Sequence, residues 1–389
     1  MRINLKDFGA VGDGIADDFA AIQAVLDKCD GETIVIPTGD YRVTATLKVG
    51  SNTRIQAADD ARIFMCGETM RYRGDFLISN ADNVYGNENI TIDGGIWDGN
   101  NQGRLITKPD LFDRNGYCGS VMNFVTVKNL TLQNLTVANS VTYNVRMSRV
   151  ENFIIQNIKF FSAEFGFNQD GLHFGGGVKN GIVENIAAIS KGQTNDDMLA
   201  FNADDSIERV ENLDLYREAI ENIVVRNVYA EDCHTLVRFL SVNAPIRNIK
   251  IDNISGGCRC YAINMDGARY CRTPLFKEEN TPKGVGVIEN VHIDNMTTHK
   301  TANHKNPLMA MESNVNNFSV TNFKREFDKE PPNTDDKPSL TAQFRNLVNM
   351  KVTTESGDKV VLGDKQDCFE IDGDCAGFRV TRDAKDTRF

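Results

Sequence analysis

Three carboxylates in two short segments are the residues of this sequence whose types and spacing could do chemistry. Asp170 lies in residues 167–173, and the pair Asp196-Asp197 lies in residues 194–202. If the two segments stack one above the other, the three carboxyl groups meet in one cluster facing solvent. Like charges at close range raise at least one pKa, so an acid persists at neutral pH beside an ionised base. Hydrolysis of a glycosidic bond needs such an acid and base.

A repeated phrase predicts the fold that would bring these segments together. An Asn is followed by strand-like residues and by a second Asn five positions later, and the copies lie about 25 residues apart with two wider gaps. Alternating apolar residues indicate a strand, and Asn tolerates the left-handed backbone of a tight corner. Units this small must stack, which predicts an all-β parallel β-helix with three short strands per coil. The copies are residues 129–134, 152–157, 180–185, 222–227, 248–253, 290–295 and 317–322, with weaker copies from Asn89 and Asn346.

We expect residues 1–389 to form a single domain, with an N-terminal cap over residues 1–50 and coils over about 51–375. Residues 7–18 are rich in glycine and acidic side chains, and Asp17 or Asp18 can cap the helix that follows. A short amphipathic helix here would plug the open end of the solenoid. Glycines 9, 12 and 14 do not indicate a nucleotide loop, because no βαβ unit and no phosphate-binding Lys accompanies them. Residues 33–43 are predicted to form two strands around a turn.

Three longer stretches interrupt the repeat, at residues 100–119, 268–284 and 326–338. Long loops of a compact repeat often wall a functional groove, although tolerated surface insertions are the alternative. The third stretch is predicted to be a mobile linker between coils. The first two contain side chains suited to stacking on sugars and hydrogen-bonding to them, namely Arg104, Tyr117, Arg269, Tyr270 and Arg272.

Composition excludes several classes of partner. The net charge of −11 and the pI of about 5.1 argue against nucleic acid and anionic membrane, which need a basic face. No run is apolar enough to span a bilayer, and the first residues contain no signal region. We therefore expect a cytoplasmic protein, or a secreted one if a signal peptide has been trimmed. The nine Cys lack metal-like pairing, so we expect reduced thiols and neither a metal nor a cofactor. The oligomeric state stays open.

Several motifs at the start of the chain resemble those of known right-handed β-helix proteins. Residues 7–14, Asp17-Asp18, residues 20–23 and residues 37–41 resemble the opening of the pectate-lyase-like and polygalacturonase-like proteins. The two acidic segments resemble the polygalacturonase family, glycoside hydrolase family 28. In that family an Asn-Thr-Asp-Gly-Ile-Asp rung precedes a Gly-Asp-Asp-Cys rung. Residues 168–173 match the first rung and residues 195–198 match the second.

The resemblance implies a role for each carboxylate. Asp196 would be the general acid, while Asp170 and Asp197 would hold and deprotonate the attacking water, with inversion at the anomeric carbon. The implied fold is a right-handed parallel β-helix, and the implied partner is a carbohydrate.

The sequence departs from the family at two motifs. Arg238 matches the Arg of the family's Arg-Ile-Lys motif, but Leu240 stands where the Lys would clamp a sugar carboxylate, so galacturonate itself is in doubt. The family's Gly-His-Gly rung is missing, and His173 and His234 are the available substitutes. We predict that the substrate contacts are His173, Arg238, His234, Asn168 and Asn202.

Asp204 and Asp205 have two interpretations, since they either extend the substrate subsites or cap a turn. For an isolated acidic pair such as Asp335-Asp336, a turn cap or a Ca²⁺ site is the favoured interpretation.

The sequence therefore predicts a metal-independent glycosidase that acts on an acidic or decorated, pectin-like oligo- or polysaccharide. Two alternatives remain. A polysaccharide lyase on the same scaffold would need a base and a charge neutraliser, often Ca²⁺. A non-catalytic glycan-binding protein, similar to a phage tailspike, would not need the acidic cluster.

Overall fold

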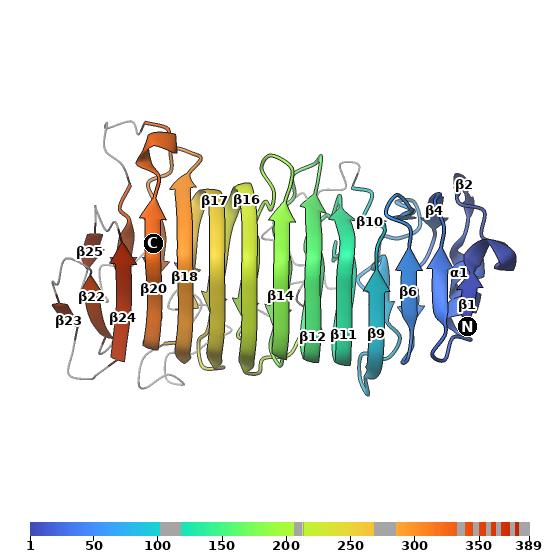
Figure 1. Cartoon of the computed structure of the whole chain (residues 1–389), viewed down its shortest axis with the longest axis horizontal. Helices are drawn as coiled ribbons and strands as arrows, with labels where there is room; N and C mark the ends of the chain where they lie inside the picture. The colour runs from blue at the N-terminus through green and yellow to red at the C-terminus, as the bar shows by residue number, and fades with distance from the viewer. Residues whose placement is uncertain are drawn as a thin grey trace.

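The computed structural model describes residues 1–101, 118–205, 212, 214–267, 285–332, 339–344, 350–354, 359–362, 367–373 and 378–380. Its coils stack along one long axis, with the N-terminus at one end and the last strands at the other (Figure 1). The chain is a right-handed parallel β-helix, as predicted. In the described part of the chain, no helix is long and apolar enough to cross a membrane. The weak copy at Asn346, the pair Asp335-Asp336 and the five predicted sugar-stacking side chains lie outside the described residues.

The helices and strands follow one another in the order of the coils. They are β1 (Arg2–Asn4), η1 (Leu5–Phe8), β2 (Asp13–Asp17), α1 (Phe19–Leu26), β3 (Thr33–Ile36), β4 (Asp40–Val43), β5 (Leu47–Val49), β6 (Arg54–Ala57), β7 (Arg62–Met65), β8 (Ile78–Asn80), β9 (Asn87–Asp93), β10 (Ile96–Asp98), β11 (Met122–Ala138), β12 (Val145–Phe161), β13 (Leu172–Gly175), β14 (Lys179–Ala188), β15 (Asp197–Asn202), β16 (Ile220–Leu240), β17 (Ile246–Met265), β18 (Ile288–Lys300), β19 (Met309–Met311), β20 (Val315–Arg325), η4 (Phe327–Lys329), β21 (Ala342–Phe344), β22 (Met350–Thr354), β23 (Lys359–Leu362), β24 (Asp367–Gly373) and β25 (Phe378–Val380). All described strand pairs are parallel except β22 with β23.

The Asn residues of the repeat form the corners of the coils. Every Asn of the complete copies has a positive φ, for example 62° at Asn129 and 56° at Asn134. Each corner turns one continuous strand onto the next face, so β11 pairs with β12 on three faces, before, between and after its two Asn corners. The structure therefore has three strand segments per coil, as predicted.

The corner side chains also bond the coils to one another. Asn222 Nδ2 donates to Asn180 Oδ1 at 3.0 Å, and Asn248 Nδ2 donates to Asn222 Oδ1 at 2.9 Å. At the second corner Asn253 Nδ2 donates to Asn227 Oδ1 at 2.8 Å. Each bond contributes about 0.5–1.5 kcal/mol net. The Asn residues of the repeat therefore specify both the left-handed backbone of each corner and a hydrogen-bonded ladder of side-chain amides along the axis.

A stack of aromatic rings fixes the strands that carry the acidic segments. The ring centroids of Phe174 and Phe201 are 5.0 Å apart, and those of Phe201 and Phe239 are 5.2 Å apart. Burying each ring contributes about 1.5–3 kcal/mol. Since side chains alternate across a strand, the residues next to these rings face outward. Those residues are His173, Ala200 and Arg238, which are in register with one another.

The N-terminal cap follows the prediction with one refinement. The helix α1 lies at the N-terminal end of the stack (Figure 1) and buries Ile22, Val25 and Leu26 in the core. Asp17 Oδ1 accepts from the Phe19 backbone N–H at 3.1 Å, so Asp17 caps the helix. The Asp18 carboxylate instead binds the N–H groups of the glycine-rich turn.

The described start of the third interruption, residues 326–332, is held by side-chain bonds, while residues 333–338 of the predicted linker lie outside the described residues. Arg325 is buried and binds both carboxylate oxygens of Glu330, at 2.7 and 2.8 Å. Arg325 also donates to Ser339 and Thr341 beyond the loop. An ion pair of this kind fixes where the chain leaves β20 and where it returns.

Candidate active site

The β-helix brings the two acidic segments into neighbouring coils. His173 on β13 pairs with Ala200 on β15, and Ala200 pairs with Arg238 on β16. Immediately before these strands the Gly171 N–H donates to the Asp197 carbonyl at 2.9 Å, and the Asp196 N–H donates to the Gln169 carbonyl at 3.4 Å. The vertical alignment on which the sequence prediction depends is therefore present.

The three carboxyl groups differ in their exposure. Asp196 is the accessible one, with 25 % of its side chain exposed, whereas Asp170 and Asp197 are buried. The prediction that all three face solvent is wrong for these two. The side chains that point away from the core of the coils bury one another, because His173 packs beside Asp170 and Arg238 packs beside Asp197.

Burial and mutual repulsion raise the pKa of both buried carboxyl groups, and raise that of Asp197 further than that of Asp170. Burial raises the pKa of Asp170 to about 6; the hydrogen bond from His173 works against this rise, and the charge of Asp196 adds to it. Burial and the negative charges of Asp196 and Asp170 raise the pKa of Asp197 well above its ordinary value, and Arg238 offsets only part of the rise. Arg238 Nη1 lies 3.6 Å from Asp197 Oδ2, which accepts no hydrogen bond within the described residues.

His173 lies between two carboxylates rather than in a substrate groove. Its Nδ1 is 2.7 Å from Asp170 Oδ2, its Nε2 is 2.9 Å from Asp205 Oδ2, and its ring stacks on Tyr143 at 4.0 Å. Burial opposes the charged imidazolium, but the two carboxylates raise the pKa of His173 to about 9. Because His173 is fully buried, the prediction that it contacts substrate is wrong. It orients Asp170 instead.

His234 lies beside the accessible acid. Its Nδ1 is 3.4 Å from Asp196 Oδ1 and 3.0 Å from Thr235 Oγ1. Burial disfavours the imidazolium, yet hydrogen bonds with Asp196 and Cys260 raise the pKa of His234 to about 10. This is the position that a substitute for the missing His rung would need, and its contact with substrate stays a prediction.

The same residues could hold a cation only by losing a proton. One ligand atom each from Asp196, Asp197 and His234 lies within 4.8 Å of the others. A metal ligand must be a neutral imidazole, whereas the raised pKa keeps His234 charged at neutral pH. A cation at this cluster would therefore have to displace the proton on His234.

Arg238 is oriented by a residue that the sequence did not reveal. Its Nε and Nη2 bind the two carboxylate oxygens of Asp266 at 3.1 and 2.9 Å, directly after β17. A bidentate pair of this kind fixes the plane of the guanidinium. The signal in the sequence is an acid 28 residues after Arg238, one coil further on, but nothing in the local pattern distinguishes Asp266 from the many other acids of the chain.

The two predicted Asn contacts have different outcomes. Asn202 is buried and donates to Asp205 Oδ2 at 3.2 Å, so the prediction that it contacts substrate is wrong. Asn168 is half-buried at a left-handed corner with φ 55°, two residues before Asp170, and its contact with substrate stays a prediction. Asp204 accepts three backbone N–H bonds from residues 242–244 and is buried, which confirms the turn interpretation for it.

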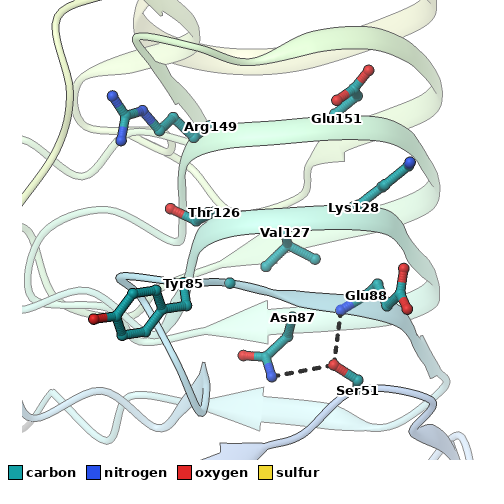
Figure 2. A pocket seen from close by; sticks show the side chains of 10 residues that line it. Ser51, Tyr85, Asn87, Glu88, Thr126, Val127, Lys128, Arg149 and Glu151 are labelled. Carbon is teal, nitrogen blue, oxygen red and sulfur yellow. Dashed lines mark hydrogen bonds between the residues drawn. The ribbon is translucent and has the colours of Figure 1, made fainter.

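A separate groove lies at a corner of the coils and contains none of the predicted site residues (Figure 2). Its volume is about 370 Å³. Figure 2 shows Tyr85 and Arg149 on one side and Lys128 and Glu151 on the other. Arg149 is held by Glu218 and by the ring of Tyr216. Its lining is Ser51, Tyr85, Gly86, Asn87, Glu88, Thr126, Val127, Lys128, Arg149 and Glu151.

The coils and the acidic cluster define a parallel β-helix protein of the pectate-lyase-like class. More particularly, the chain belongs to the rhamnogalacturonase A/epimerase, pectate lyase-like family, whose model matches residues 2–259.

Curated relatives are similar over short stretches. The chain is 49 % identical over 53 residues to mannuronan C5-epimerase AlgE4 of Azotobacter vinelandii, which is 13 % of this chain and 10 % of that enzyme. It is 31 % identical over 100 residues to the preneck appendage protein of Bacillus phage PZA, which is 26 % of this chain and 12 % of that protein. The chain thus spans about a tenth of the length of these relatives.

Solved structures resemble the chain over most of its length. The family 28 exopolygalacturonase of Yersinia enterocolitica superposes with a TM-score of 0.62 at 16 % identity, covering 98 % of this chain and 77 % of that chain. The Streptococcus pneumoniae adhesin PfbA gives 0.63 at 15 % identity, covering 98 % and 99 %. The endo-xylogalacturonan hydrolase of Aspergillus tubingensis gives 0.59 at 14 % identity, covering 89 % and 96 %. At these identities the likeness confirms the predicted fold alone.

Proposed function

We propose that the protein is a glycoside hydrolase that cleaves an acidic or decorated oligo- or polysaccharide with inversion. One observation carries the proposal: the accessible carboxyl group of Asp196 is electrostatically coupled to two buried carboxyl groups and adjoins a protonated His234. A cluster in which one carboxyl group is accessible and a neighbouring imidazolium can supply a proton suits proton delivery to a glycosidic oxygen.

In the proposed reaction Asp196 takes the proton of the charged His234 beside it and delivers that proton to the leaving oxygen. Asp170 and Asp197 hold a water on the opposite side of the anomeric carbon. The water oxygen bonds to that carbon as the glycosidic bond breaks, and a water proton passes to Asp170. Asp170 suits this step because its pKa of about 6 leaves it ionised at neutral pH.

The geometry of Arg238 favours hydrolysis over the lyase alternative. A lyase needs a charge neutraliser for the sugar carboxylate beside the base. Arg238 is 13 % exposed and is bound to both oxygens of Asp266, with Asp197 beside it. Its positive charge is therefore largely neutralised by the Asp266 carboxylate within the protein.

The non-catalytic alternative is supported by relatives of two kinds, since a phage appendage protein and a bacterial adhesin share sequence or fold with the chain. That alternative predicts glycan binding that is indifferent to the acidic cluster. The proposed hydrolase instead predicts glycan cleavage that requires the acidic cluster, so the cleavage assay with Asp196→Asn separates the two.

The test is an assay for new reducing ends on a glycan panel, with ultraviolet absorbance read in parallel for the unsaturated product of a lyase. Asp196→Asn should lower turnover by about 10²-fold or more, as loss of a general acid does, while leaving the fold unchanged. The matched control is Asp59→Asn, at an exposed turn outside the cluster, which should keep full activity. Full activity of Asp196→Asn would refute the assignment, and an absorbing product would replace it with the lyase.

A further inference from the structure

Four large apolar side chains are exposed together beside the acidic cluster. Phe165 and Phe167 are 52 % and 55 % exposed, and Phe161 and Ile189 are also exposed. They lie in neighbouring coils, where the Ile189 N–H donates to the Phe160 carbonyl at 2.9 Å. We call these four residues the aromatic rim. Large apolar side chains that are exposed in one region of a surface often mark a place where something binds.

The two phenylalanines at the centre of the rim are tied to the catalytic segments. Between them, the Gly166 N–H donates to Gln169 Oε1 at 2.8 Å, and the Gly166 carbonyl accepts from Asn195 Nδ2 at 2.7 Å. Gln169 directly precedes Asp170, and Asn195 directly precedes Asp196. The rings are therefore placed by the same residues that lead into the acids.

Further bonds make this support rigid. Gln169 is fully buried and donates from Nε2 to the carbonyls of Ser140 and Glu164, at 2.7 and 3.1 Å. Asn195 Oδ1 accepts from Arg259 Nη2 at 2.6 Å, in a coil further along the axis. Each side-chain amide that holds Gly166 is thus bound through its other polar atom as well, which fixes its direction.

Gly192 determines how the Phe165 ring lies. A Cβ on Gly192 would stand 2.1 Å from the ring, so the ring edge rests directly on the backbone of the next coil. This contact covers one side of the ring and leaves the remainder open. A large apolar ring that is fixed and half exposed gains little from folding, so its position needs another explanation.

We propose that Phe165 and Phe167 form a stacking subsite for a pyranose ring of the substrate, adjoining Asp196. The apolar C–H face of a sugar ring fits the electron-rich face of a phenyl ring, which carries partial negative charge. Leu240 occupies the place of a carboxylate clamp and Arg238 is bound to Asp266, so stacking rather than charge would hold this sugar. The subsite would therefore accept a neutral pyranose or the uncharged face of a uronate. The inference rests on the proposed function only in taking the ligand to be a glycan.

The test measures binding in a chain that cannot turn over. Asp196→Asn serves as the parent, and its retention is measured by affinity electrophoresis in gels containing polygalacturonan, xylogalacturonan, mannuronan or a neutral xylan. Phe165→Ala/Phe167→Ala in this parent should weaken retention at least tenfold on any glycan that retains the parent. Phe167→Tyr, which keeps an aromatic face, should preserve it. The matched control is Phe8→Ala, because Phe8 is 55 % exposed at the N-terminal cap.

Three results would overturn the subsite. The double alanine variant could bind as tightly as its parent, the parent could bind none of the four glycans, or light scattering could show that the parent is a dimer which the alanine variant separates. The last result would mean that the rim joins two copies of the chain. Circular dichroism confirms that each variant is folded, and Phe167→Ala alone replaces the double variant if the latter fails to fold.

The outcomes also separate the subsite from the hydrolase. If the wild type binds a glycan through the rim but releases no reducing ends, the hydrolase fails and the subsite stands. If the wild type cleaves a glycan and the double alanine change leaves KM unaltered, the subsite fails and the hydrolase stands.

Discussion

Replacing Asp197 by asparagine is expected to stabilise the protein while abolishing turnover. Asp197 is buried beside two other acids, so its pKa is raised well above the ordinary value of 3.8. Asparagine has nearly the same shape and carries no charge at any pH. Arg238 keeps both of its bonds to Asp266 in the variant, so the change leaves no cation without a partner.

The magnitude and its sign follow from proton linkage. Above pH 3.8 the unfolded chain releases the Asp197 proton, while the folded chain keeps it until the raised pKa is reached. The stabilising contribution of this carboxyl group is therefore complete below pH 3.8 and is lost as pH rises toward the folded-state pKa. The loss is about 1.4 kcal/mol for each pH unit by which the folded-state pKa exceeds the ordinary value.

The assay is urea unfolding of wild type and Asp197→Asn at pH 4, 5, 6 and 7. The difference in free energy of unfolding should be near zero at pH 4 and should grow steadily in favour of the variant. Asp59→Asn, at an exposed position, should show no such growth. A difference that stays constant with pH would mean that Asp197 does not hold a proton in the folded state, and the electrostatic account of the site would fail.

Other predictions address the base, its orientation and the corners. The kcat/KM of the wild type should fall as pH drops below about 6, where Asp170 becomes protonated, and a flat profile from pH 5 to 8 would exclude Asp170 as the base. His173→Gln removes a hydrogen bond that lowers the pKa of Asp170, so the acidic limb of the same profile should move to higher pH; an unmoved limb would contradict the orienting role of His173. Asn157→Ala replaces a side chain that tolerates φ 57° by one that does not and removes both ladder bonds of Asn157, to Asn134 and from Asn185, which should cost about 2–3 kcal/mol in urea unfolding. Asn157→Gly should cost less, since glycine accepts this φ, and equal costs would refute the left-handed corner as the reason for the Asn.

The fold could be predicted from the sequence because its signal is local and repeated. An Asn at a left-handed corner depends only on its own backbone, and the amide ladder requires another Asn at the same corner of the next coil. The phrase therefore encodes both the shape of a coil and its stacking. The alignment of Asp170 with Asp196 and Asp197 followed from this register, without knowledge of any side-chain contact.

The site was predicted less well, because strand register does not tell which side chains are buried by other parts of the chain. His173 and Asn202 lie on the expected face, yet both are buried against Asp205. Burial at this face depends on loops and on long side chains from other coils, which no local pattern reports. Asp266 was missed for a similar reason, since its partner Arg238 lies in another coil and no local pattern reports their contact.

The rigidity of the scaffold explains how such a costly site can persist. Two buried acids with raised pKa values and an outward-facing apolar rim each work against stability. The amide ladder and the aromatic stack of Phe174, Phe201 and Phe239 run through the coils that carry these features. Each coil is held by both neighbours, so an unfavourable rung cannot relax without breaking bonds in two others. The stabilisation predicted for Asp197→Asn follows from this arrangement. The scaffold cannot relax to relieve the cost of burying the Asp197 carboxyl group, so this cost should be recovered as stability when asparagine replaces it.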